Sequence, residues 1–160
     1  MTKELYPIPL RELRALSSVK IWELNLYLNN FPSIDPIKGT ISAEIQDKVL
    51  LLSGNIETII MLNCDRCMNE YNQILKCETS EKIWLGKIHS NSENLLSGIG
   101  FDEEFVDCID PRDEFNPKRW IFEQLSLQVP SLKICGDKCK GHYSLLKTKD
   151  NLEQTTELSL

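Results

Sequence analysis

The chain has 160 residues, 41% of them hydrophobic, which fits one globular domain with its own core. A formal net charge of −6 argues against a general nucleic-acid binder, because such proteins carry a broad excess of Lys and Arg. The opening residues lack the apolar run of a secretory signal and no membrane-length apolar segment follows, so we expect a soluble, cytoplasmic protein.

The apolar periodicity predicts a short helix followed by strands. Leu10, Leu13 and Leu16 recur at helical spacing after Pro9, which indicates an N-terminal helix. Alternation of apolar and polar residues then predicts extended segments in the first half of the chain. They cover residues 20–29, 41–45, 49–52, 55–63 and 71–85. Ser53 and Gly54 either bend one strand or separate two.

The second half of the chain is predicted to contain an exposed loop, an acidic segment and a helix. Residues 86–100 are mostly polar without periodicity, and residues 102–114 hold seven acidic side chains against one arginine. We interpret the acidic segment as solvated surface in preference to a docking site. Residues 116–127 begin with Asn-Pro and are strongly apolar, which predicts the longer helix.

The predicted architecture is an α+β domain over residues 1–147, followed by a disordered tail over residues 148–160. We expect a mostly antiparallel, twisted sheet or partial barrel of about five strands. The short N-terminal helix and the longer C-terminal helix pack on it.

Two pairs of cysteines are the main candidates for chemistry. Cys64 and Cys67 lie at the tip of a predicted hairpin, and Cys135 and Cys139 follow the longer helix. Four thiolates in two close pairs suit a tetrahedral zinc ion, provided that the fold brings the pairs together. One structural zinc ion is the predicted cofactor, and the alternative is four thiols that bind no metal.

The stretch after Pro130 is the one basic part of the chain and the candidate for RNA contact. Its lysines could bind phosphates, a tyrosine within it could stack on an unpaired base, and an arginine joins them if the two cysteine loops meet. These residues are Lys133, Lys138, Lys140, Lys147, Tyr143 and Arg66.

Three motifs, taken together and in this order, resemble the YceD-like family of large ribosomal RNA subunit accumulation proteins. They are Leu62–Met68 after an apolar strand, Glu123–Pro130 and Cys135–Gly141. The resemblance implies a factor for ribosome biogenesis that binds metal and either precursor RNA or a ribosomal protein, without a membrane or small-molecule partner. Fuller family members continue the last motif with another cysteine pair, where this chain has Tyr143 and Leu146.

Two other functions remain open. An acidic protein-interaction adaptor would use the acidic segment and make no RNA contact. A thiol oxidoreductase is less favoured, because a redox Cys-x-x-Cys begins a helix, whereas Cys64 and Cys67 join two predicted strands. No catalytic triad, phosphate-binding glycine loop or paired-histidine helix is present, so no enzyme activity is expected.

Overall fold

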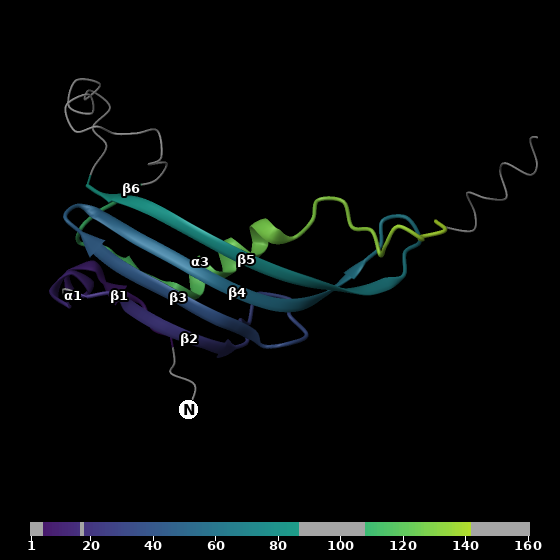
Figure 1. Cartoon of the computed structure of the whole chain (residues 1–160), viewed down its shortest axis with the longest axis horizontal. Coiled ribbons are helices and arrows are strands. Elements are labelled where there is room, and N and C mark those ends of the chain that lie inside the picture. Colours follow the sequence, from purple (N-terminus) through teal and green to yellow (C-terminus); the bar gives the residue numbers. More distant parts are fainter. Residues whose placement is uncertain (1–4, 17, 87–107, 142–160) are drawn as a thin grey trace, which may run out of the picture.

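The structure is a computed structural model that describes residues 5–16, 18–86 and 108–141. Its centre is a five-stranded sheet with the order β2-β3-β4-β5-β6. The long strands β4 (Val49–Asn63) and β5 (Glu70–Leu85) are antiparallel along their whole length. On the other side of β4, β3 (Ile37–Gln46) and β2 (Lys20–Leu26) continue the antiparallel pairing. The strands curve along their length, so the sheet is curled (Figure 1).

The prediction of a mostly antiparallel sheet is wrong, because the sheet is mixed. Its last strand, β6 (Cys108–Ile109), pairs with β5 in parallel. A second, two-stranded sheet joins β1 (Ile8–Pro9) to β7 (Glu114–Phe115). Strands of two residues are too short to display alternation, so the sequence pattern did not predict β1, β6 or β7.

The long strand β4 is continuous through Ser53 and Gly54. At Gly54 a Cβ atom would lie 2.9 Å from a ring carbon of Trp120, closer than carbon atoms pack. The glycine therefore marks where the longer helix approaches the sheet, and not a break between two strands.

The longer helix, α3 (Pro117–Gln128), packs on one face of the sheet. Its first turn is capped by Asn116, whose Oδ1 accepts the Arg119 N–H at 3.2 Å. Trp120 and Leu125 are buried against the sheet. Two side chains of α3 also donate hydrogen bonds to the carboxylate of Glu81 on β5: Trp120 Nε1 at 2.7 Å and Gln124 Nε2 at 2.6 Å.

The short helix α1 (Leu10–Ala15) joins the same core. Its residues Leu10 and Leu13 are buried and belong to the apolar cluster that includes Ile121 of α3. In the described part of the chain, both helices thus cover the same face of the sheet, and the opposite face carries no helix.

The sequence predictions for both helices agree with the structure to within a few residues. The predicted loop at 86–100, apart from its first residue, and the predicted tail lie outside the described residues. All six cysteines are free thiols, of which Cys77 is buried and Cys108 is exposed. None of the helices in the described ranges has the length and apolar character needed to span a membrane.

Candidate metal centre

The first cysteine pair lies at the end of a two-stranded extension of the sheet. Pairing between β3 and β4 stops at Glu57, and β4 continues to Asn63 beside β5. Figure 1 shows this extension leaving the rest of the sheet and ending in a turn. Cys64 and Cys67 occupy that turn, which closes with a hydrogen bond from the Met68 N–H to the Cys64 carbonyl at 2.9 Å.

The second cysteine pair reaches the same place from the end of α3. Two hydrogen bonds hold its loop against the first turn: Asp65 N–H donates to the Lys133 carbonyl at 2.7 Å, and Lys133 N–H donates to Asp65 Oδ2 at 2.7 Å. Asp65 thus aligns the two loops, a role that the sequence analysis missed. The sequence feature that could have indicated this role is an Asp inside the Cys-x-x-Cys turn, because Asp side chains in turns often accept hydrogen bonds from nearby backbone N–H groups. We call the two loops, residues 64–68 and 133–140, the cysteine tip.

The four sulfur atoms gather at the cysteine tip. Cys64 Sγ lies 3.7 Å from Cys139 Sγ, Cys67 Sγ lies 3.7 Å from Cys135 Sγ, and all four lie within 4.8 Å of one another. Zinc–sulfur bonds of about 2.3 Å in a tetrahedron imply sulfur–sulfur edges of about 3.8 Å. The 3.7 Å separations are far longer than the roughly 2.05 Å bond of a disulfide. The cluster therefore fits a tetrahedral metal ion, and its soft donors suit zinc.

The backbone around the cluster has a positive φ at three residues, Met68, Gly136 and Gly141. Gly136 has φ 154°. Three residues later, the Cys139 N–H donates a hydrogen bond to the Gly136 carbonyl at 3.1 Å, which closes a turn in the second loop. Met68 has φ 63°, in the left-handed region that costs a residue with a Cβ about 1–2 kcal/mol.

The pKa values of two thiols in the cluster, Cys64 and Cys135, are shifted in opposite directions. The backbone hydrogen bond from Cys67 is the main cause that lowers the pKa of Cys64 to about 6, with a further bond from the Cys135 N–H, while burial opposes the shift. Contact with the thiol of Cys139, and then with those of Cys64 and Cys67, raises the pKa of Cys135 to about 12. Four thiolates so close together require a cation to offset their mutual repulsion.

The predicted RNA-binding residues divide into two groups. Arg66, Lys138 and Lys140 are exposed on the cysteine tip, and Lys133 is half-buried at the contact between its loops. Tyr143 and Lys147 lie outside the described residues. The structure therefore brings Arg66 to the lysine-bearing loop, although these residues are 67 or more positions apart in sequence.

The comparisons with known proteins give one family and no individual relative. No curated protein and no solved structure gives a significant match. Residues 52–159, more than half of the chain, match the family described as Large ribosomal RNA subunit accumulation protein YceD. The matched range contains both cysteine pairs, α3 and most of the β4–β5 ribbon, and its name refers to accumulation of the large-subunit ribosomal RNA. The chain belongs to the YceD family.

Proposed function

We propose that this protein promotes accumulation of the large-subunit ribosomal RNA by binding precursor RNA at the cysteine tip, without catalysing a reaction. The observation that carries the proposal is the contact between the two loops. It gathers cations from distant parts of an acidic chain onto one surface: Arg66, Lys133, Lys138 and Lys140. Arginine and lysine at such a surface bind phosphate through charge-assisted hydrogen bonds.

In the proposal a structural zinc ion holds the two loops together. Four thiolates around one Zn²⁺ carry a net charge of about −2. Together with Asp65 and Asp137, this charge balances the four cations of the cysteine tip. Attraction to RNA would then depend on how closely each cation approaches a phosphate, and less on the net charge. The expected binding is modest and falls steeply with added salt.

The absence of catalysis is also part of the proposal. Cys64 and Cys67 join two strands, and neither lies at a helix N-terminus as in a dithiol oxidoreductase. The low pKa of Cys64 comes first from a backbone hydrogen bond within its own turn, and it equally favours the thiolate that a metal ion binds. A metal ion that uses all four thiolates leaves no open coordination position for substrate, which is typical of structural zinc sites.

The test measures binding of the full chain to a fluorescent transcript of precursor large-subunit RNA at several salt concentrations. The double substitution Lys138→Glu and Lys140→Glu should weaken binding. Loss of two phosphate contacts should also lower the slope of log affinity against log salt by about 1.4 for single-stranded RNA. The matched control is Arg11→Glu with Lys118→Glu, which changes the net charge equally on elements far from the cysteine tip.

Equal loss of affinity in the control pair would mean that only the net charge matters and would contradict the proposal. A second measurement follows the native protein through a sucrose gradient of cell extract. We expect it in fractions that contain immature large subunits, and its absence from every ribosomal fraction would count against the function proposed here.

A further inference from the structure

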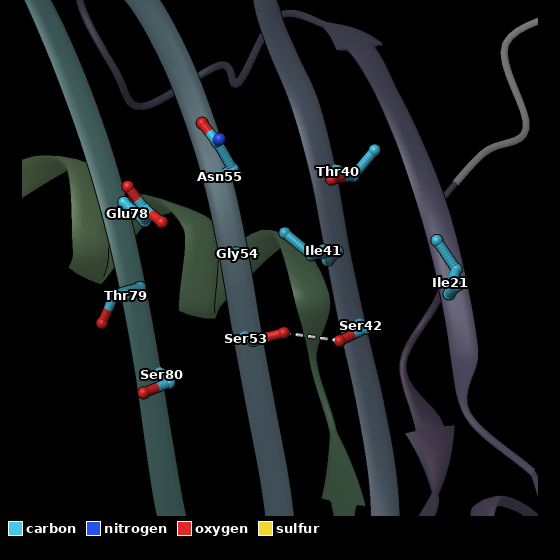
Figure 2. Close-up of a pocket in the computed structure, with 10 residues that line it drawn as sticks. All are labelled: Ile21, Thr40, Ile41, Ser42, Ser53, Gly54, Asn55, Glu78, Thr79 and Ser80. Atoms are coloured by element: carbon cyan, nitrogen blue, oxygen red, sulfur yellow. Dashed lines mark hydrogen bonds between the residues drawn. The ribbon is translucent and has the colours of Figure 1, made fainter.

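The face of the sheet that points away from the two helices carries a polar hollow. We call this side of β2–β5 the open face. Figure 2 shows the hollow with α3 behind the sheet and the side chains of four strands in front of it. Its volume is about 470 Å³. Side chains on its lining include Ile21, Thr40, Ser42, Ser53, Asn55 and Glu78.

The strand register arranges these side chains in two rows. One row runs Glu23, Thr40, Asn55, Glu78, and the next runs Ile21, Ser42, Ser53, Ser80. Strands lie about 4.8 Å apart, so the two carboxylates of the first row are separated by about 14 Å. The rows themselves are about 7 Å apart, because they differ by two residues along each strand.

The hollow contains one charged side chain, surrounded by uncharged polar groups. Glu78 is its one ionised side chain, and the others are hydroxyl, amide or aliphatic groups. Among the residues that the structure describes, Glu78 and Glu23 form no salt bridge or side-chain hydrogen bond, whereas Glu57 in the neighbouring row faces Lys76 at 3.9 Å. Within the described residues, the open face therefore presents two carboxylates without an ionic partner, at the ends of a row of hydroxyl and amide groups. The next row toward the cysteine tip carries Lys38 and Lys76 on either side of Glu57.

An apolar strip continues the open face toward the cysteine tip. Ile59 and Ile74 are directly opposite each other, and Met61 is their diagonal neighbour. Met61 and Ile74 are 48% and 57% exposed. Ile59 lies four positions after Asn55 along β4, so the strip begins about 13 Å from the hollow. An extended segment of about five residues would span both.

We propose that the open face binds a basic segment of a partner protein, with an arginine or lysine side chain in the hollow and an apolar side chain on the strip. A guanidinium or ammonium group has only donors, which suits the Glu78 carboxylate and the neighbouring hydroxyl and amide oxygens that can accept. The hydroxyls of Ser42 and Ser53 also hydrogen-bond each other at 2.7 Å (Figure 2). Ile21, 65% exposed at the edge of the hollow, would cover the aliphatic stem of that side chain. Phosphate groups would be repelled by the same carboxylates. This adds a protein contact to the RNA contact above, and rests on the proposed function only in expecting a partner from the large subunit.

The test uses fluorescent decaarginine as the probe and the full chain as the receptor. The double substitution Glu23→Lys with Glu78→Lys should weaken binding about five- to tenfold, since each exposed ion pair contributes modestly. The matched control, Glu12→Lys with Glu114→Lys, makes the same change of net charge on exposed residues of α1 and β7. It should change affinity less than twofold if the site is local. Amide NMR shifts in residues 40–42, 53–55 and 78–80 would locate the peptide on the open face.

Four results would overturn the inference: no binding of decaarginine, equal weakening in both variant pairs, peptide-induced shifts confined to other acidic surfaces, or shifts in residues 40–42, 53–55 and 78–80 of the unsubstituted chain when precursor RNA is added. The last would make the open face an RNA surface. The milder Glu78→Gln variant removes one charge at nearly constant size, and its affinity for decaarginine should fall about twofold. An effect of this size in such a conservative variant is not a folding defect. Failure of decaarginine to bind leaves the RNA test at Lys138 and Lys140 unaffected, so the two proposals fail separately.

Discussion

The body of the sheet and the cysteine tip are held together in different ways. In the body, Ile56 and Ile121 are fully buried between β4, β5 and α3. At the cysteine tip, Cys64 alone is fully buried, and the contact between loops consists of a few hydrogen bonds such as that from Asp65 to Lys133. Apolar burial therefore stabilises the body, whereas the tip has only local hydrogen bonds and four sulfur atoms at distances that fit a metal ion.

This difference implies that the two regions can lose their structure separately. Regions with few buried apolar contacts open at lower free energy than a packed core. A change in the core should destabilise the whole molecule, and a change at the cysteine tip should affect metal and RNA while the sheet remains folded. The following predictions test that separation, from the largest effect to the smallest.

Removing core volume should give the largest effect. Ile56 is fully buried in the middle of β4, so Ile56→Ala should lower the free energy of unfolding by about 3 kcal/mol through lost burial and the cavity left behind. Urea denaturation monitored by circular dichroism measures this. The control Ile74→Ala, on a side chain 57% exposed, should change stability by less than about 1 kcal/mol. Comparable losses in the two variants would mean that the core does not lie where burial places it.

Removing one sulfur should weaken metal binding strongly and leave the sheet folded. Cys64→Ser replaces a thiolate at the centre of the cluster, and we expect zinc affinity to fall about 100-fold or more. Zinc content after dialysis and competition with a chromogenic chelator measure it, and the urea midpoint of the sheet should not move. Cys108→Ser, at an exposed cysteine outside the cluster, should keep full zinc content. Unfolding of the whole chain on chelation would contradict independence of the two regions.

Relieving backbone strain at the cysteine tip should give the smallest effect. Met68 has φ 63°, which glycine adopts without steric cost. Met68→Gly should therefore raise zinc affinity slightly, by no more than about fivefold, because greater chain freedom in the open form offsets part of the relief. Chelator competition measures the change. The opposite substitution is Gly136→Ala: an alanine rarely adopts φ 154°, so this variant should bind zinc more weakly. A weaker zinc site in Met68→Gly would show that the methionine side chain itself supports the turn.

Much of the fold followed from local patterns. Alternating residues located β2 to β5, and the Asn116-Pro117 cap located the start of α3, because period and capping depend on neighbours within a few positions. The parallel strand β6 could not be predicted in this way. Its pairing with Trp84 and Leu85 is a contact between distant segments, and two residues contain no periodic signal.

The candidate site was predictable in its residue types and not in its geometry. Spacing identified Cys64 and Cys67 as one pair and Cys135 and Cys139 as another. The aligning role of Asp65 was not visible, because its partner Lys133 is 68 residues away. The hollow on the open face was equally hidden, since a row such as Thr40, Asn55 and Glu78 exists only once the register of three strands is fixed.

Local sequence patterns were enough to identify both helices, the four long strands, the two close cysteine pairs and the basic stretch, because these properties depend on residues near one another in the chain. Three features came from the tertiary structure alone: the four sulfur atoms gather at one place, Arg66 lies beside the lysine-bearing loop, and neither of the two described helices lies over one face of the sheet. Those facts depend on strand register and on the path of the chain after α3, which are set by packing of the whole core.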